Sequence, residues 1–240
     1  MIENRFVFIM PCYNAQKTIT QSLFSVIGQS YSNWKILIRD DMSTDNTRNI
    51  IDNVIRVFGL QEKVFVKTNT EKTWEVGNIL DMLKECEEDD IVCRLDGDDW
   101  LSDLDGLAIL NMRYNETAAD VIWTQHRWSF TDFNISKYLP KDANPYEHPW
   151  VTSHFKTFRK KLIVNVPDSN FRGKDGEYFK RIGDQAIYLP VLHNANGNWH
   201  HEPKVMYHYT IDIKKETFES EDAQFQKEEG EFLRNRGYLE

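Results

Sequence analysis

Short apolar runs alternate with amphipathic stretches along the first part of the chain, and this pattern predicts the fold class. Four apolar runs are typical of buried strands: residues 5–10, 34–38, 64–66 and 91–95. Four stretches carry apolar residues at helical spacing: residues 18–27, 50–58, 76–86 and 103–114. Strands that alternate with helices in this way form a mainly parallel sheet with helices on both faces. The sequence therefore predicts an α/β fold.

The pattern becomes less regular after residue 115. Further short strands are expected at residues 121–123, 127–130, 153–159 and 204–209. Residues 131–150 are rich in Pro, Asn and Asp, which favours an excursion or lid over a domain linker. A short helix interrupted by Pro190 is expected at residues 184–192. From Glu216 the chain is strongly acidic, which predicts a surface helix with a solvated face.

Polar clusters follow three of the four predicted strands in the first part of the chain. They are Pro11-Cys12-Tyr13-Asn14 after the first strand, Asp40-Asp41 after the second, and Asp96-Gly97-Asp98 after the fourth. Pro11 is expected to end the first strand. Ligands of parallel sheets bind beyond the carboxyl ends of the strands. The three clusters should therefore meet at one edge of the sheet and form a binding site there.

The third cluster is strongly acidic, because Asp96, Asp98 and Asp99 lie within four residues. Like charges so close together repel one another unless a counter-charge is present. Carboxylate oxygens suit magnesium, manganese or calcium. The alternative is a solvated acidic turn before the helix that begins near Ser102 or Asp103. The buried strand before the cluster and the two other polar clusters favour the metal site.

Composition and charge limit the class of protein. The 240 residues suffice for one sizeable domain, and 40% apolar content with 13% aromatic residues indicates a folded chain. A net charge of −9 argues against a broad phosphate-binding surface. Three cysteines without C-x-x-C spacing indicate buried thiols rather than disulfides or zinc ligands. No signal peptide or membrane-spanning stretch is visible, so we expect a cytoplasmic protein without a membrane anchor.

Three motifs resemble those of the family 2 glycosyltransferases, which have the nucleotide-diphospho-sugar (GT-A) fold. Residues 9–14 are similar to that family's I-I-P-x-Y-N, and residues 40–45 to its D-D-G-S-T-D, with Met42 in place of glycine. Residues 95–101 look like its D-x-D-D metal site. In the second half, Gly183-Asp184 stands where the family has Glu-Asp. The resemblance is clearest over roughly the first 110 residues.

The resemblance implies a single GT-A (Rossmann-like) domain with a mainly parallel sheet and a less regular C-terminal half. Residues 1–115 would form the half that binds the nucleotide-sugar. Residues 116–215 would bind the acceptor and carry the catalytic base. Residues 216–240 would form an acidic C-terminal helix or tail.

A nucleotide-sugar donor, expected to be UDP-linked, and Mn²⁺ or Mg²⁺ as cofactor are also implied by the resemblance. Asp98 would hold the metal, and Asp96 would contact the ribose or water bound to the metal. Arg94 or Lys72 would add positive charge at the phosphates. The other donor-site residues expected from the motifs are Pro11, Tyr13, Asn14, Asp40, Asp41 and Gly97.

Asp40 is suited to accept the imide hydrogen of uracil, with Pro11 and Tyr13 packed against the base or hydrogen-bonded to it. Two simpler interpretations stay open. Asp40 and Asp41 could cap a helix, and Tyr13 could be an ordinary core aromatic.

Inverting transfer requires a general base that takes the proton of the acceptor hydroxyl, and Asp184 is the candidate. The alternative is that Asp184 caps the helix that follows it. His208 is a candidate third metal ligand, since a late histidine completes the metal site of some GT-A enzymes.

Two other functions remain open from the sequence. A sugar nucleotidyltransferase would normally carry a glycine-rich loop after the first strand, and residues 11–15 contain no glycine. A catalytically dead nucleotide-sugar-binding module is compatible with the missing glutamate before Asp184.

The acceptor could be a glycan, a protein, a small molecule or a modified nucleic-acid base. Aromatic residues could stack on it, namely Trp123, Trp128, Trp150 and Trp199. A basic group could contact an anionic acceptor, namely Lys156, Arg159, Lys160, Lys161, Arg172 and Lys174.

Overall fold

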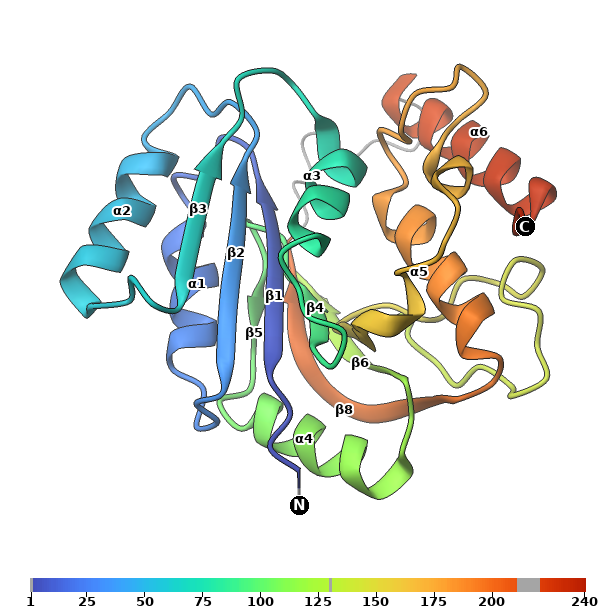
Figure 1. Cartoon of the computed structure of the whole chain (residues 1–240), viewed down its shortest axis with the longest axis horizontal. Helices are drawn as coiled ribbons and strands as arrows, with labels where there is room; N and C mark the ends of the chain where they lie inside the picture. Colours follow the sequence, from blue (N-terminus) through green and yellow to red (C-terminus); the bar gives the residue numbers. More distant parts are fainter. Residues whose placement is uncertain (1, 130, 211–220) are drawn as a thin grey trace.

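The computed structural model describes residues 2–129, 131–210 and 221–240, and it has the predicted α/β architecture (Figure 1). The described strands are β1 (Phe6–Cys12), β2 (Trp34–Asp40), β3 (Val64–Thr68), β4 (Ile91–Arg94), β5 (Trp100–Leu101), β6 (Val121–Trp128), β7 (Lys156–Arg159) and β8 (Trp199–Tyr209). The described α-helices are α1 (Ile19–Ile27), α2 (Thr47–Phe58), α3 (Trp74–Leu83), α4 (Gly106–Thr117), α5 (Gly183–Ala195) and α6 (Glu221–Arg236). Short 3₁₀ turns span Lys160–Leu162 and Asp168–Phe171.

All eight described strands form one mixed sheet with the order β3-β2-β1-β4-β7-β6-β8-β5. β1 pairs in parallel with β2 on one side and with β4 on the other, and β3 continues the parallel part beyond β2. β7 then pairs antiparallel with β4 and with β6. The carboxyl ends of β1, β2 and β4 therefore lie side by side at one edge, as the sequence predicted.

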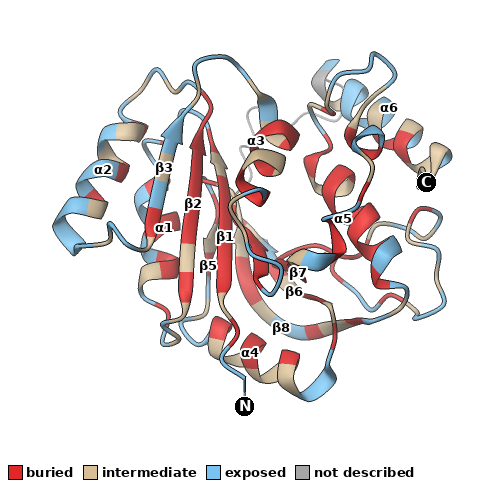
Figure 2. Ribbon diagram, in the orientation of Figure 1, coloured by how far each residue is buried: buried red, intermediate tan, exposed pale blue. Residues whose placement is uncertain are grey.

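The apolar run of β1 is buried because helices cover both faces of the sheet, as Figure 2 shows. Alternate side chains of a strand point to opposite faces. Val7 and Ile9 belong to the core cluster that contains α3 and α5 residues. Phe6, Phe8 and Met10 belong to the cluster that contains residues of α1, α2 and α4. Two core layers thus hold the parallel strands and the loops at their ends.

The second half of the sheet is more regular than the sequence indicated. Residues 121–123 and 127–130 were expected as two strands, but β6 runs without a break from Val121 to Trp128, with irregular register against β8. Thr124 lies in the middle of β6 and is fully buried, and its backbone N–H and its hydroxyl both bond to the backbone of Phe155. These partners let a polar stretch continue as a buried strand.

Other boundaries also differ from the expectation. β1 continues through Pro11 to Cys12, and β8 begins at Trp199 rather than at residue 204. α5 is continuous although Pro190 lies inside it. β7 is almost entirely buried rather than half-buried.

The acidic C-terminal segment does form a helix over Glu221–Arg236, and one side of it packs onto the domain. Leu233 is fully buried in the core, and Phe232 and Tyr238 pack against it. The first part of the expected segment, residues 216–220, lies outside the described residues. Within the described parts of the chain, no helix is both long and apolar enough to cross a bilayer.

Candidate active site

Hydrogen bonds join the polar loops that follow β1, β2 and β4. The backbone N–H of Asn14 donates to Ser43 Oγ at 2.9 Å, and Asn14 Oδ1 accepts the N–H of Thr44 at 2.9 Å. The carbonyl of Gly97 accepts the hydroxyls of Thr18 (3.0 Å) and Ser22 (2.9 Å), which lie on the segment after the first loop. The convergence of the three clusters is confirmed.

The backbone geometry at two motif positions shows which residue types fit there. A Cβ atom on Gly97 would lie 2.8 Å from Cys12 Cβ, so only glycine allows the acidic loop to approach β1 this closely. Met42 has φ of 66°, a left-handed conformation that glycine adopts more readily. Met42 therefore occupies a strained position where the resembling motif has glycine.

Asp40 and Asp41 have different structural roles, and both are buried. Asp40 Oδ1 accepts the N–H of Ser43 at 3.0 Å and so shapes the turn after β2. Asp41 accepts the backbone N–H groups of Thr73 (2.9 Å) and Trp74 (3.1 Å). The capping interpretation thus applies to Asp41, but the helix is α3 rather than α2, which follows it in sequence.

Tyr13 is exposed, with 52% of its surface in solvent, so its interpretation as a core aromatic is wrong. Lys72 Nζ lies 3.2 Å from the centroid of the Tyr13 ring and 3.3 Å from Asp41 Oδ2. The Trp74 ring lies 5.7 Å from the same nitrogen. A cation beside an exposed aromatic platform offers both stacking and charge to a ligand.

Arg94, at the end of β4, connects the acidic loop to the second half of the chain. Its side chain is only 9% exposed, and one of its nitrogens lies 3.1 Å from Asp96 Oδ2. The same guanidinium forms ion pairs with Glu75 of α3 and Asp184 of α5. Burial alone would lower the pKa of Arg94, but the negative charges of Asp96 and Glu75 outweigh burial and raise it. Three carboxylates from three segments thus share one buried cation.

Asp184 is the second residue of α5, whose N-cap is Ile182, so the interpretation as N-cap is wrong. Its carboxylate is 27% exposed and faces Arg94, Lys156 Nζ at 2.6 Å and His154 Nε2 at 3.3 Å. Burial, reinforced by neighbouring positive charge, lowers the pKa values of Lys156 and His154 well below their ordinary range. Asp184 is therefore a solvent-accessible carboxylate surrounded by proton-bearing groups.

The carboxylates of the acidic loop face in different directions. Asp99 points inward, where it accepts hydrogen bonds from Tyr207 Oη (2.7 Å) and from the N–H of Thr210 (2.7 Å). Asp98 is exposed at the end of the loop. Loss of hydration around its carboxyl group and the negative charge of Asp96 raise the pKa of Asp98 to about 6. Asp99 is structural, whereas Asp98 is available to a ligand.

A divalent cation fits this loop. Among the described residues no group of three His, Cys, Asp or Glu side chains could by itself hold a metal ion. A site of the kind that magnesium uses needs only one or two carboxylates together with substrate phosphates. Asp98 forms no ion pair with any described residue, so its oxygens remain open to a cation.

His208 lies on β8, paired with Trp100 of β5 directly after the acidic loop. Its ring stacks on Trp100 with 3.9 Å between centroids, and its Nε2 lies 3.4 Å from Ser129 Oγ. Burial and the charge of Arg127 lower the pKa of His208, which favours the neutral form that binds metals.

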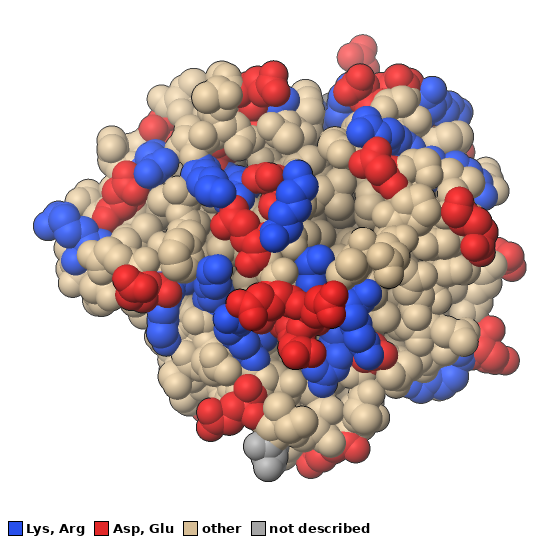
Figure 3. Space-filling view, viewed as in Figure 1, with Lys and Arg blue, Asp and Glu red and all other residues tan. Residues whose placement is uncertain are grey.

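Several expectations for the acceptor side are wrong. Trp123 and Trp199 are buried core residues and cannot stack on a substrate. The expected basic group is dispersed, because Lys156 is buried beside Asp184, and Lys161 pairs with Asp120 at 2.7 Å. Figure 3 shows acidic and basic side chains intermixed on the face in view, without one broad basic surface.

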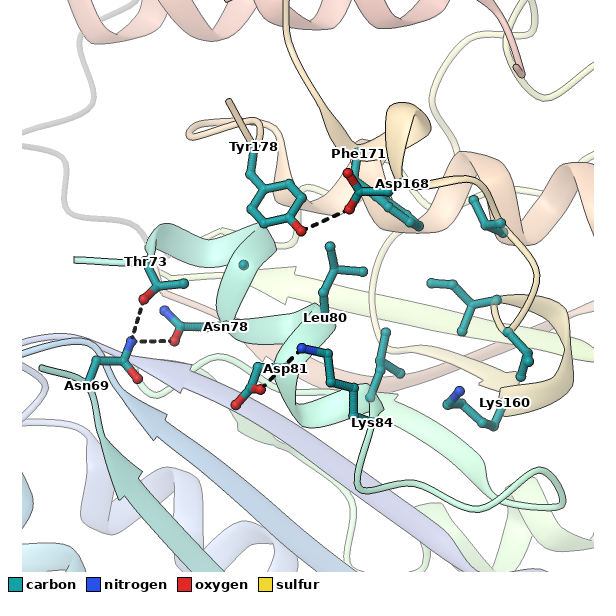
Figure 4. A pocket seen from close by; sticks show the side chains of 15 residues that line it. Asn69, Thr73, Asn78, Leu80, Asp81, Lys84, Lys160, Asp168, Phe171 and Tyr178 are labelled. Atoms are coloured by element: carbon teal, nitrogen blue, oxygen red, sulfur yellow. Dashed lines mark hydrogen bonds and ion pairs between the residues drawn. The ribbon is translucent and has the colours of Figure 1, made fainter. Parts of the chain in front are cut away.

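A cavity of about 500 Å³ lies beside α3, and no residue of the Arg94 cluster lines it. Figure 4 shows the residues that do. Its polar side includes Asn69, whose Nδ2 donates to Thr73 Oγ1 (3.1 Å) and Asn78 Oδ1 (2.7 Å). Leu80 and Phe171 contribute to its apolar side. None of the residues expected to bind the donor or to act as base lines this cavity.

Sequence reasoning missed Glu75, and it placed Lys156 in a basic group for the acceptor without connecting Lys156 or His154 with Asp184. All three lie outside the three recognised motifs. His154 and Lys156 lie 30 and 28 residues before Asp184 in the sequence, and Glu75 reaches Arg94 from another element. The available signal was a lysine, Lys156, at the start of a predicted strand that is otherwise largely buried.

Comparison with known proteins supports the fold and the motifs. A family model described as "Glycosyl transferase family 2" matches residues 7–174, more than half of the chain. The UDP-Glc:alpha-D-GlcNAc-diphosphoundecaprenol beta-1,3-glucosyltransferase WfgD of Escherichia coli is 58% identical over 40 residues. That match covers 17% of this chain and 16% of WfgD, so it spans about a sixth of the relative's length.

Two solved structures have a similar fold. S. aureus TarS 1–349 in complex with UDP-GlcNAc has a TM-score of 0.70 and 20% identity, over 98% of this chain and 68% of that chain. The mannosyltransferase PcManGT from Pyrobaculum calidifontis, in complex with GDP-Man and Mn²⁺, has a TM-score of 0.63 and 15% identity, over 88% and 58% respectively. The predicted GT-A fold is confirmed.

Proposed function

The chain belongs to glycosyl transferase family 2, and from this premise we propose that it transfers a sugar from a UDP-linked donor to an acceptor hydroxyl, with inversion at the anomeric carbon. The Arg94 cluster carries the proposal. One guanidinium connects Asp96, at the end of β4, with Asp184, at the start of α5. A carboxylate of the expected donor side and the candidate base therefore belong to one ion-pair network.

The proposed reaction is a single displacement. The acceptor oxygen attacks the anomeric carbon on the face opposite the nucleotide, and the bond between that carbon and the diphosphate oxygen breaks. The bonding electron pair leaves with UDP, and Asp184 takes the proton of the acceptor hydroxyl. One displacement on one face inverts the configuration and requires no covalent enzyme intermediate.

On the donor side, Asp98 would hold Mn²⁺ or Mg²⁺, with Asp96 at the ribose or at metal-bound water and His208 as a further ligand. When bound, such a cation neutralises charge on the leaving diphosphate. Lys72 is the cation assigned to the phosphates, because it pairs with one carboxylate, Asp41, whereas Arg94 is shared among three.

The base-binding side rests on the loops after β1 and β2. Tyr13 would stack on the uracil together with Pro11, and Asp40 would accept the imide hydrogen. Asn14, Asp41 and Gly97 would keep these loops in position through the contacts described above. The relatives differ in donor, since WfgD is named for UDP-Glc and PcManGT was solved with GDP-Man. We therefore base the proposal of uracil as the donor base on Asp40.

The acceptor is proposed to carry a free hydroxyl group, on a glycan, a protein, a small molecule or a modified nucleic-acid base. Incubation with candidate acceptors and a UDP-sugar, followed by mass spectrometry, would reveal the product by the added mass of the sugar.

Calorimetric titration with UDP, GDP and ADP in the presence of Mn²⁺ tests the assignment of the donor. We expect UDP to bind at least about tenfold more tightly than the other two, which corresponds to about 1.4 kcal/mol. Asp40→Asn should reduce this preference. Equal affinities for the three nucleotides would remove Asp40 from base recognition.

A further inference from the structure

Glu75 occupies the space beside Asp184 that a side chain at position 183 would need. Gly183 is the first residue of α5, and a Cβ atom placed on it would collide with the carboxylate carbon and with both carboxylate oxygens of Glu75. This carboxylate comes from α3, more than one hundred residues earlier in the chain. The position where the resembling motif has glutamate is therefore filled by a carboxylate from another helix.

The same carboxylate belongs to the ion-pair network of Asp184. One terminal nitrogen of Arg94 pairs with Glu75, and the other terminal nitrogen pairs with Asp184. The Glu75 side chain is 26% exposed and the Asp184 side chain is 27% exposed, so both are only partly buried. A guanidinium is planar and its N–H donors have fixed directions. A partner bound to one terminal nitrogen therefore restricts where a partner of the other nitrogen can lie.

The position of Glu75 in the first turn of α3 suggests a simpler role, stabilisation of the helix dipole. Two observations weigh against that explanation. Asp41 already accepts the N–H groups of Thr73 and Trp74 at this helix end. The Glu75 side chain pairs with Arg94.

We propose that Glu75 is the positioning residue of the candidate base: it replaces from α3 the carboxylate that the chain lacks at position 183, and through Arg94 it fixes Asp184. This inference rests on the proposed function, because it takes Asp184 to be the base. It also explains why glycine stands before Asp184, since any larger residue would displace Glu75.

A stability cycle tests the geometry without any activity. Alanine in place of glycine near a helix start normally does no harm to the helix. Here Gly183→Ala should lower Tm by about 2 to 4 °C, because the new methyl group displaces the Glu75 carboxylate from its place beside Arg94. In the Glu75→Ala background the same substitution should leave Tm unchanged or raise it. Equal Tm changes in the two backgrounds would overturn the proposal.

A kinetic cycle tests the positioning role by the rate of UDP release from a UDP-sugar. Glu75→Ala should lower kcat about 10- to 100-fold while the donor KM changes less than about threefold, since a misplaced base slows chemistry more than binding. The double variant Glu75→Ala/Gly183→Glu, which returns a carboxylate from position 183, should recover most of that loss. Glu62→Ala, which removes an exposed carboxylate in a loop, is the matched control and should leave kcat unchanged.

Wild-type kcat in Glu75→Ala, or no recovery in the double variant, would contradict the positioning role. Failure of the proposed function gives a different result. A wild-type protein that releases no UDP from any donor would argue against glycosyl transfer, and the stability cycle would still decide where Glu75 lies relative to position 183.

Discussion

At the scale of single residues, the candidate site depends on carboxylates whose surroundings differ. Asp184 faces three nitrogen-bearing side chains, and Asp99 is buried and accepts a hydrogen bond from Tyr207. Asp98 lies in an exposed part of the loop, although its carboxyl group has lost part of its hydration. Similar side chains can have different chemical tasks when burial and neighbouring charge differ. We assign proton transfer to Asp184 and cation binding to Asp98 on this basis.

Asp184→Asn tests the assignment of the base. The amide keeps the size of the side chain but cannot take the proton of the acceptor, so kcat should fall by roughly two to four orders of magnitude. UDP affinity should stay within a few-fold of the wild type. Asp175→Asn, which changes an exposed carboxylate in the preceding loop, is the control and should be nearly silent. An Asp184→Asn variant that works within a few-fold of wild type would refute the role.

The pKa of Asp98, raised to about 6, predicts how donor binding depends on pH. Below that pH the carboxyl group is protonated and competes with Mn²⁺, so affinity for a UDP-sugar in Mn²⁺ should fall by about tenfold per pH unit below pH 6. Calorimetry at several pH values with an intact UDP-sugar, whose diphosphate stays ionised, measures this. Affinity that is constant between pH 5 and 7.5 would contradict the assignment.

The same shift has a defined effect on stability without metal. The folded pKa of Asp98 lies above its ordinary value of 3.8, so the folded state binds more protons than the unfolded state between about pH 4 and pH 6. The contribution of this group to stability is therefore full below pH 4 and is lost as pH rises through 6. A bound cation would relieve the repulsion that remains above pH 6.

The site residues that the sequence identified correctly are those that lie in the motifs. Tyr13, Asn14 and Gly97 were found because short segments of sequence carry their signal, and the loops that contain them do meet. Glu75 was not found, because its role depends on a glycine in another element. The glycine at position 183, where the resembling motif has glutamate, gave no indication of which residue fills the space.

At the scale of elements, a side chain in the loop after β2 fixes the start of helix α3. Asp41, after β2, accepts the first backbone N–H groups of α3. Burial alone would raise the pKa of Asp41, but the hydrogen bonds from Thr73 and Asn69 outweigh burial and lower it. α3 in turn carries Glu75 to Arg94. The loop after β2 therefore contributes to the position of α3 and, through it, to the candidate base.

Asp41→Ala tests this dependence. Loss of the carboxylate leaves partly buried N–H groups of the α3 terminus without this partner, so unfolding free energy in urea should fall by about 1 to 3 kcal/mol. The folded pKa of Asp41 is lowered, so its stabilisation is present above pH 4 and is lost as pH falls further. The control is Asp52→Ala, which removes an exposed ion-pair partner of Arg48 and should lower the unfolding free energy by less than about 1 kcal/mol. A loss at Asp41 no larger than at Asp52 would argue against the dependence.

Elements of the first half were predictable because their periodicity is local. Strands β1 to β4 and helices α1 to α4 lie close to the predicted ranges. The second half was harder, because β6 and β7 bury Thr124, His126 and Lys156, and polar side chains obscure the alternation of a strand. Their partners lie 28 to 31 residues away in sequence, and no local pattern identifies them.

At the scale of the whole molecule, one sheet joins the two halves of the chain. β4 carries Arg94 and pairs directly with β7, which carries Lys156, so the expected donor and acceptor sides are connected through adjacent strands. The division into residues 1–115, 116–215 and 216–240 stays a prediction about roles. The sheet itself continues across the first of these boundaries.

UDP release from UDP-glucose and UDP-GlcNAc, with water or an added acceptor taking the sugar, tests the central claim most directly. In Mn²⁺ the wild-type protein should release UDP from at least one donor, EDTA should abolish the release, and fresh Mn²⁺ or Mg²⁺ should restore it. Asp98→Ala should lower the rate by at least about a hundredfold while Tm stays close to that of the wild type, because a metal-assisted leaving group loses several kcal/mol of stabilisation. Full release in chelator, or wild-type rates in Asp98→Ala, would contradict the account.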